Sequence, residues 1–162
     1  MPEIRLVTKD NWRELTRLQV SENQKHFVAS NVHSIAESQF GFDHPEEGHW
    51  DMAPFGIYDN DEPVGFLMIG TNHSGPTTQG FVIRLMVDEK HQKKGYGMFA
   101  MKWILDHFRA DERVKAVGIS YEPENDVARK LYAALGFVGT GEIYEGEVVA
   151  VIKLRPKGLV DL

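Results

Sequence analysis

The amino-acid sequence predicts a mixed α/β domain, with a central, mostly antiparallel sheet of about seven strands and about four helices on its two faces. Short segments rich in β-branched and apolar residues, bounded by turn residues, are typical of strands, as in residues 63–70 and 116–121. Apolar residues at helical spacing follow residue 95 and again residue 125. Because helices and strands intersperse without a repeat, the pattern indicates one mixed sheet, and 162 residues can bury its core.

The first elements are a strand and a helix. Residues 4–7 predict the strand, and Thr8 or Asp10 can cap the helix that follows. The inward face of this helix would carry Trp12, Leu15 and Leu18.

A second helix is expected over residues 32–40, with Ser30 or Asn31 as its cap. Residues 41–51 contain glycines, a proline and several charged residues without periodicity. We therefore expect an irregular loop there, one that lines or covers a substrate site.

Three strands then form an antiparallel meander. Residues 52–58 and 63–70 flank a polar turn at 59–62, which predicts a hairpin. After a loop at 72–80, the apolar run 81–87 supplies the third strand.

The second half begins with a helix from Gly95. The apolar face of this helix would carry Met98, Met101, Leu105 and Phe108. Residues 116–121 predict the next strand, and Pro123 ends it.

The last helix begins at a cap formed by Asn125 or Asp126. Its apolar stripe would consist of Val127, Ala128, Leu131, Tyr132 and Leu135. Gly136 stands where a left-handed residue ends a helix, and Phe137 can supply the apolar contact of such an ending.

A hairpin closes the chain, with strands over 138–144 and 147–154 around a turn at Glu145-Gly146. Residues 155–162 are expected to be a loose tail, and residues 1–162 to form a single domain.

Composition and charge exclude several classes of protein. The formal net charge is −6, whereas a nucleic-acid-binding domain normally has a basic surplus, so we expect no nucleic-acid partner. Cysteine is absent, which excludes disulfides, thiol nucleophiles and zinc–thiolate sites, and no metal is expected. The N-terminus has no apolar signal core, and no apolar run approaches the length of a membrane span, so the sequence predicts a cytoplasmic protein without membrane contact.

The segment from Gln92 to Gly97, QKKGYG, joins the strand at 81–87 to the following helix. The first N–H groups of a helix lack intrahelical partners, and the helix dipole adds partial positive charge there. Gly95 and Gly97 let a ligand approach the backbone closely, while Lys93 and Lys94 add positive charge. This combination predicts a binding site for a pyrophosphate group.

The glycine turn also matches G-x-G-x-x-[GA], the dinucleotide fingerprint, at residues 95–100. In a Rossmann fold the first glycine directly follows a strand, and an acidic residue lies about 20 positions further on. Here the strand ends at Val87, so Gly95 does not follow it directly. About 20 positions further on, Lys115 and Ala116 stand where the acidic residue is expected. A Walker loop would need Gly-Lys-Ser/Thr, which is absent. A nicotinamide oxidoreductase is thus disfavoured.

Two segments resemble motifs of the GNAT superfamily of N-acetyltransferases. Residues 85–88, LMVD, followed by QKKGYG, resemble its acyl-coenzyme A signature, [QR]-x-x-G-x-[GA]. Residues 125–137 resemble its second motif, N-x-x-A-x-x-x-Y-x-x-x-G-F. The order of the elements is similar over nearly the whole chain. Residues 20–29 and 31–36 are similar to bacterial spermine/spermidine acetyltransferases of the superfamily.

The resemblance implies that acetyl-CoA is the co-substrate and that a primary amine attacks it directly in a ternary complex. A backbone N–H of the strand at 85–87 would polarise the thioester oxygen. Tyr132 is the implied general acid, because a phenol is protonated at neutral pH and can donate to a leaving thiolate. The implied coenzyme-binding residues are Leu85, Met86, Val87, Gln92, Lys93, Lys94, Gly95, Tyr96, Gly97, Met98, Asn125 and Tyr132.

The implied acceptor is a polyamine such as spermidine or spermine. Its ammonium groups need carboxylates, and those available are Glu22, Glu37, Asp51, Glu142, Glu145 and Glu147. Of these, Glu22, Glu37 and Glu142 are the candidates. Many relatives carry a glutamate on the central strand, where residues 81–84 of this chain are FVIR. No residue is therefore assigned as general base; Glu22, His26, Glu37 and Glu142 stay open.

Two alternatives stay open as well. One is an acetyltransferase for another small amine or an amino acid, and the other is a non-catalytic acyl-CoA sensor that keeps the glycine turn. Relatives commonly pair, so a homodimer is also expected.

Overall fold

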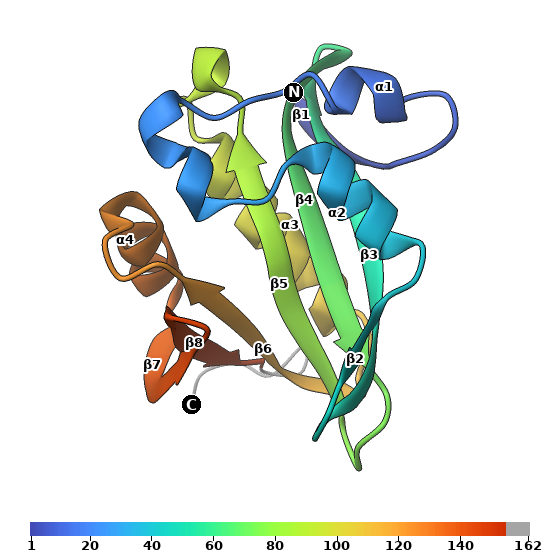
Figure 1. The fold of residues 1–162 in the computed structure, drawn as a ribbon, viewed down its shortest axis with the longest axis vertical. Coiled ribbons are helices and arrows are strands. Elements are labelled where there is room, and N and C mark those ends of the chain that lie inside the picture. The colour runs from blue at the N-terminus through green and yellow to red at the C-terminus, as the bar shows by residue number, and fades with distance from the viewer. Residues whose placement is uncertain (155–162) are drawn as a thin grey trace.

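The computed structural model describes residues 1–154, so the expected tail at 155–162 lies outside the described residues. Within them, the sheet runs β1-β3-β4-β5-β6-β8-β7, with β2 paired to β3 (Figure 1). The strands are β1 (Pro2–Leu6), β2 (Phe42–His44), β3 (Gly48–Asp59), β4 (Glu62–Asn72), β5 (Thr78–Val87), β6 (Val114–Tyr121), β7 (Val138–Tyr144) and β8 (Glu147–Lys153). The helices are α1 (Trp12–Leu15), α2 (Asn31–Ser38), α3 (Tyr96–Arg109) and α4 (Asp126–Leu135), with 3₁₀ turns η1 (Glu22–Phe27) and η2 (Glu89–His91). The predicted fold class is confirmed.

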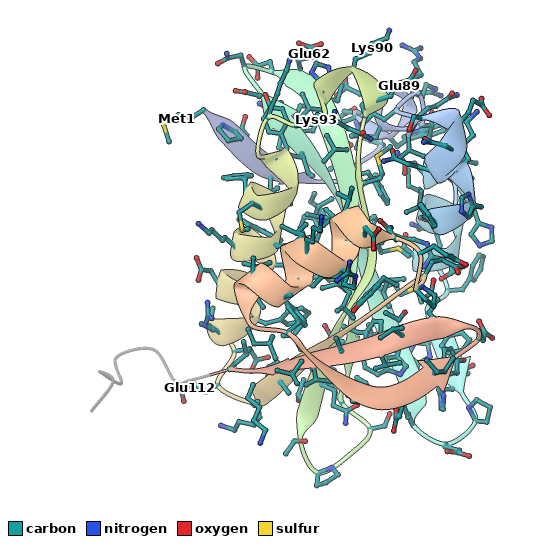
Figure 2. The ribbon with its side chains drawn as sticks, turned by 90° about the vertical axis from the view of Figure 1, so that its left-hand side faces the viewer. Met1, Glu62, Glu89, Lys90, Lys93 and Glu112 are labelled. Carbon is teal, nitrogen blue, oxygen red and sulfur yellow. The ribbon has the colours of Figure 1, made fainter. Side chains whose placement is uncertain are left out.

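Helices cover both faces of the sheet, and the side chains of β4 are accordingly buried on both faces. Leu67 and Ile69 belong to the core beneath α3 and α4, whereas Phe66 and Met68 belong to the core beneath α1 and α2. All four side chains are at most 2 % exposed. A strand buried on both faces is a continuous apolar run, as this one is. Figures 1 and 2 show α3 and the α1–α2 pair on opposite sides of the sheet.

Strands β5 and β6 run parallel, and their pairing ends early. The last paired residues are Val82 and Ile119. Beyond them, β5 continues to Val87 along β4, and β6 continues to Tyr121 along β8. The two ends diverge in Figure 1. We call this divergence of residues 83–87 from residues 120–121 the fork.

A β-bulge lies in β5 at the base of the fork. Met68 is opposite Arg84 and Ile69 is opposite Val82, so Ile83 is the extra residue. A bulge bends its strand and increases the local twist. The bend contributes to the separation of β5 from β6.

Both helices predicted around the sequence motifs are confirmed. Helix α3 begins after Gly95, whose φ is +87°, and buries most of its predicted apolar face. Helix α4 ends at Gly136, whose φ is +99°, and the Phe137 N–H donates to the Tyr132 carbonyl at 3.1 Å. This is the hydrogen bond of a Schellman ending, and Phe137 is buried as expected.

Two residues predicted to point inward are exposed. Trp12 is 37 % exposed on α1, which is a single turn, and the Arg13 guanidinium lies over one face of the indole ring, 4.7 Å from its centroid. Val127 is 71 % exposed in the first turn of α4, where Ala128 takes the buried position beside it.

The caps of the first two helices can be compared with the prediction. Asn11 directly precedes α1, but its side chain caps no helical N–H. Thr8, one of the two predicted caps, accepts the Asp10 N–H through its hydroxyl at 3.2 Å and the Trp12 N–H through its carbonyl at 3.1 Å. The Ser30 cap of α2 is confirmed, since its Oγ accepts the His33 N–H at 3.2 Å.

The prediction of an irregular loop over residues 41–51 is wrong. Strand β2 and the start of β3 form a hairpin, with Phe42 opposite Trp50 and His44 opposite Gly48. The hairpin buries Trp50 against Phe81, with the ring centroids 6.0 Å apart. The charged side chains that obscured the strand pattern are exposed at its surface. Across residues 1–154, no helix is long and apolar enough to cross a membrane.

Candidate active site

The turn before α3 presents a row of unused backbone donors. Among the described residues, no partner accepts the N–H groups of residues 92–98, and the helical bonds begin with Phe99 N–H donating to Gly95 O at 3.0 Å. Lys93 and Gly95 have φ values of +65° and +87°. Left-handed residues within such a turn let successive N–H groups form an anion-binding concavity. The turn therefore suits a diphosphate.

The two glycines leave room beside this turn. Nothing lies within 4 Å of a Cβ built on Gly95, and a Cβ on Gly97 would lie 3.5 Å from Leu131 of α4. The protein by itself would thus accept a small side chain at 97, and any intolerance would come from a bound ligand. Lys93 and Lys94 are exposed at this end of the molecule, where Figure 2 shows Lys93 above α3. The residues present fit coenzyme A.

The side chain of Gln92 is used within the protein. Its Nε2 donates to the Val87 carbonyl at 3.0 Å and to Gln24 Oε1 at 2.9 Å. Asp88 adds a second tie, because its Oδ1 accepts the Gln19 N–H at 2.9 Å. These bonds fasten the turn to the end of β5 and to η1, so Gln92 positions the turn, and its backbone N–H stays available to a ligand.

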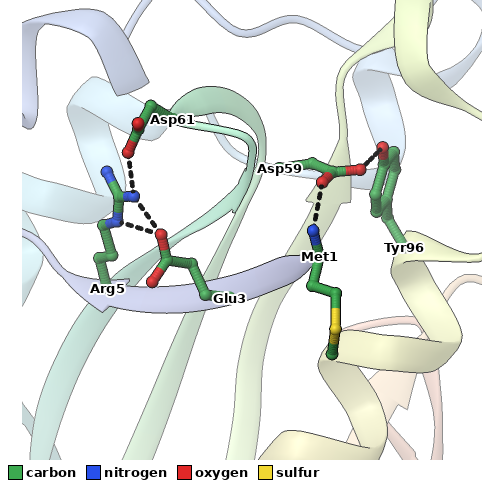
Figure 3. A network of polar contacts seen from close by, with 6 residues as sticks. All are labelled: Met1, Glu3, Arg5, Asp59, Asp61 and Tyr96. Carbon is green, nitrogen blue, oxygen red and sulfur yellow. Dashed lines mark hydrogen bonds and ion pairs between the residues drawn. The ribbon is translucent and has the colours of Figure 1, made fainter.

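Tyr96 likewise anchors the start of α3. Its hydroxyl donates to Asp59 at 2.6 Å, and the Met1 amino group lies 3.4 Å from the other oxygen of that carboxylate (Figure 3). Beside it, Arg5 pairs with Glu3 and with Asp61. The phenol of Tyr96 therefore points to the β3–β4 turn, which leaves its backbone N–H for a ligand.

Removing the Tyr96 hydroxyl should destabilise the fold in a pH-dependent manner. The bond from Tyr96, with a smaller contribution from the terminal amine, lowers the pKa of Asp59 below 3.8. A carboxyl whose pKa is lower in the folded state than in the unfolded state stabilises the fold at pH values above the unfolded-state pKa. This stabilisation is lost as the pH falls through the folded-state pKa. We expect Tyr96→Phe to melt below the wild type at pH 7, with the gap narrowing as the pH falls below about 4. Melting curves across this range measure it, with the exposed Tyr144→Phe as control; a constant gap would contradict the assignment.

The backbone of β5 presents donors to the fork at alternate residues. Asp88 N–H donates to Val64 O at 2.8 Å, which makes these opposite residues a hydrogen-bonded pair. Hydrogen-bonded and non-bonded pairs alternate in antiparallel strands. Met86 N–H is thus directed at β4, whereas the N–H groups of Leu85 and Val87 face the fork. Two of the three predicted strand residues therefore direct an N–H group into the fork.

Tyr132 is a buried residue of α4 and lies close to the end of β6. Its side chain is 8 % exposed, and its ring centroid is 5.6 Å from that of Tyr121. Burial raises the pKa of the Tyr132 phenol well above its usual value, and the charge of Glu147 adds to the increase. The phenol stays protonated over the whole neutral range. Asn125 caps α4, because its side chain accepts the Ala128 N–H at 3.2 Å.

Arg84 follows the bulge residue of β5, and α2 brings a carboxylate to it. Arg84 lies 3.8 Å from Glu37 Oε2, and His33 lies 3.1 Å from the same oxygen. The Nε of Arg84 is buried, with no hydrogen-bond partner among the described residues. Glu37 thus lies beside the fork, on the α1–α2 face, with its charge shared between two basic side chains.

A second carboxylate lies at the other side of the fork. Ser120, the first residue of β6 beyond the paired region, donates its hydroxyl to Glu147 Oε2 of β8 at 2.5 Å. Glu22 and Glu142, both predicted as substrate residues, are exposed on η1 and on β7. Glu22 pairs with Lys25 at 2.6 Å. The structure therefore places Glu37 and Glu147 on either side of the fork, and it leaves Glu22 and Glu142 at the surface.

The predicted list of site residues omits Ser120, Arg84 and Glu147. Glu147 follows a Glu-Gly turn, which made it one of several turn carboxylates. The signal that could have singled it out is register: β8 places it next to the end of β6. Within residues 1–154, no group of three or more His, Cys, Asp or Glu side chains could hold a metal ion.

Together these residues form a site with two approaches. One side offers backbone donors at the α3 turn and along β5, which suit an anionic, amide-bearing coenzyme. The opposite side, beneath α2, offers carboxylates that suit a cationic acceptor. The fork connects the two sides.

The comparison with family models matches residues 12–137 to the family described as "Acetyltransferase (GNAT) family". The spermine/spermidine N(1)-acetyltransferase of Bacillus subtilis (strain 168) is 29 % identical over 156 residues, which cover 93 % of this chain and 97 % of that protein. A probable spermine N(1)-acetyltransferase of Bacillus subtilis subsp. natto (strain BEST195) is 28 % identical over the same length.

Solved structures share the fold at lower identity. A spermidine N-acetyltransferase from Vibrio cholerae, in complex with CoA and spermine, superposes with a TM-score of 0.68 at 16 % identity. That match covers 94 % of this chain and 95 % of the other. The ribosomal-protein-S18-alanine N-acetyltransferase from Escherichia coli superposes with a TM-score of 0.66 at 14 % identity, over 99 % of this chain and 100 % of the other.

Proposed function

Because this chain belongs to the GNAT family of acetyltransferases, and is thus an acetyl-CoA-dependent N-acetyltransferase, we propose that its acceptor is a polyamine such as spermidine or spermine. The observation that carries the proposal is the match, over 93 % of the chain, to a spermine/spermidine N(1)-acetyltransferase. The carboxylates of Glu37 and Glu147 beside the fork support it, because ammonium groups bind carboxylates through charge-assisted hydrogen bonds.

The chain would bind the coenzyme mainly through its backbone. The N–H groups of residues 92–98, with Lys93 and Lys94, would hold the diphosphate. The free edge of β5 would pair with the amide-bearing arm and carry the thioester into the fork. There the N–H of Leu85 or Val87 would donate to the thioester oxygen, an interaction whose loss typically costs about 3–4 kcal/mol of transition-state stabilisation.

Acetyl-CoA supplies an activated acetyl group, and the chain would supply the proton for the departing sulfur. Tyr132 lies on the α4 side of the fork with its phenol protonated. It can donate to the thiolate as the carbon–sulfur bond breaks. The amine would approach from the opposite side, beneath α2, so both substrates would be bound at once and react directly.

Comparing acceptors that differ in charge tests the polyamine proposal. Spermidine and n-butylamine both have a primary amine, but only spermidine has further ammonium groups for the carboxylates. Each charge-assisted hydrogen bond contributes about 1.5–3 kcal/mol, so we expect kcat/KM for spermidine to exceed that for butylamine at least about tenfold. Thiol release from acetyl-CoA measures both rates.

The same assay addresses the alternatives. Equal rates for the two amines would contradict a polyamine acceptor and favour another small amine or an amino acid. Binding of acetyl-CoA without turnover of spermidine, spermine, butylamine or amino acids would favour the acyl-CoA sensor, which the lack of a carboxylate at residues 81–84 of β5 supports. A homodimer and a cytoplasmic location stay predictions.

A further inference from the structure

The reaction needs a proton acceptor for the amine, and β5 has no carboxylate at the fork. Residues 81–84 of that strand are FVIR, and Arg84 is basic. A residue that takes the proton must therefore come from another element. It must also lie on the face from which the amine approaches.

Strand β6 leads to such a residue. Its pairing with β5 ends at Ile119, so Ser120 is the first β6 residue inside the fork. Val117 and Ile119 are buried in the core beneath α3 and α4. Since side chains alternate along a strand, Ser120 points to the opposite face, which is the face of α2. Gly118 agrees, because a Cβ there would meet the Phe81 ring on that same face at 2.7 Å.

Glu147 lies on the same face as Ser120. On β8 it alternates with residues such as Ala150, which belongs to the core beneath α3 and α4. Its carboxylate accepts the Ser120 hydroxyl at 2.5 Å, which fixes one oxygen at the fork. The side chain is only partly buried, so an incoming amine can reach it.

The charge around Glu147 favours an ammonium group. Glu37, on the other side of the fork, already has Arg84 and His33 beside it. Among the described residues, no basic side chain lies within ion-pair distance of Glu147. Its charge also acts on Tyr132, raising the pKa of that phenol. Glu147 is therefore an uncompensated negative charge close to the proposed acid.

We propose that Glu147, held by Ser120, binds the attacking amine and takes its proton. Glu147 first takes one proton from the bound ammonium and passes it to water, which leaves a neutral amine. As its nitrogen bonds to the thioester carbon, the carbon–sulfur bond breaks and its electron pair leaves on sulfur. Nitrogen gives its second proton to the Glu147 carboxylate, which also releases it to water, while Tyr132 gives one proton to sulfur and recovers one from water. One ammonium and one thioester thus yield one amide, one thiol and one proton.

This inference rests on the proposed function, and Glu147→Gln tests it. The substitution keeps the shape and the hydrogen bond to Ser120 but removes the charge and the proton acceptor. General-base catalysis contributes about 10²–10⁴-fold, so we expect kcat/KM for spermidine to fall by about 10²–10³-fold at pH 7.5. Binding of acetyl-CoA should not change.

The pH profile separates a catalytic role from a structural one. A free amine needs no base, and alkylammonium groups titrate near pH 10, so the deficit of Glu147→Gln should narrow as the pH approaches about 10. Ser120→Ala removes the hydrogen bond to Glu147 but keeps the carboxylate, so it should lower kcat/KM by about tenfold or less. Glu112→Gln, the same change at the other end of β6, should match the wild type.

Each outcome decides the question. Wild-type rates in Glu147→Gln at pH 7.5, or a deficit that is constant up to pH 10, overturn the inference. If Glu147→Gln melts at a much lower temperature, Glu147→Asp supplies the test: a rate well above that of the Gln variant supports a carboxylate base, and an equal rate overturns it. If spermidine is not an acceptor, the best amine of the panel replaces it. If the wild type turns over no amine at all, the proposed function fails and the inference falls with it.

Discussion

Replacing Tyr132 with phenylalanine is expected to lower kcat by about 10²–10³-fold while leaving the fold intact. The phenol is buried and protonated on the α4 side of the fork, and the variant removes only its oxygen. No hydrogen bond from this hydroxyl to another described residue is lost, so the melting temperature should hold within about 2 °C. Single-turnover thiol release and a melting curve measure the two effects.

The raised pKa of Tyr132 also predicts the alkaline limb of the pH profile. Burial disfavours the phenolate, so the acid form persists above the usual value near 10. Wild-type kcat should therefore not fall through ionisation of a tyrosine at or below pH 10. Tyr121→Phe, whose ring lies 5.6 Å away, is the matched control and should keep most of the activity. Full activity in Tyr132→Phe would show that another group protonates the sulfur.

Substituting Gly97 separates coenzyme binding from folding. Gly97 is the second residue of α3, where glutamate is favourable for the helix dipole and alanine is about 1 kcal/mol better than glycine in helix propensity. The nearest atom to a new Cβ is Leu131 Cδ2 at 3.5 Å, an ordinary contact. We therefore expect Gly97→Ala and Gly97→Glu to melt at or above the wild-type temperature.

Coenzyme affinity should change in the opposite direction. The glutamate places a negative side chain beside the donors that would hold the diphosphate, and we expect its Kd for acetyl-CoA to rise at least about 100-fold, with a smaller rise for alanine. Isothermal titration of both variants measures this change. Lys102→Glu, an exposed charge reversal further along α3, is the control. Normal affinity in Gly97→Glu would contradict the diphosphate site at this turn.

Local signals in the sequence were sufficient for much of the fold. Gly95 and Gly136 mark the start of α3 and the end of α4, because both positions need a positive φ that other residues rarely adopt. The helical spacing of the α3 core residues was equally readable, since it depends on the period of one helix. The hairpin at residues 41–51 was not predicted, because its alternation is obscured by charged side chains on the exposed strand face.

The candidate site also has features that the sequence predicts and features that it does not. The donors of residues 92–98 follow from a contiguous motif, and so does the position of Tyr132 on its helix. The partners of that motif do not, because they depend on register between distant strands: Gln92 bonds to Gln24, and Tyr96 bonds to Asp59.

The sequence by itself determined the family motifs, the turn before α3 and, through the family resemblance, the class of reaction, because each motif consists of residues a few positions apart whose backbone geometry is local. Only the tertiary structure decided where the β5–β6 pairing stops and which carboxylates reach the fork. Ser120 and Glu147 are 27 positions apart and meet at 2.5 Å only through the pairing of β6 with β8. Spacing along the chain carries no information about such a contact, since a one-residue change of register would turn Glu147 to the other face.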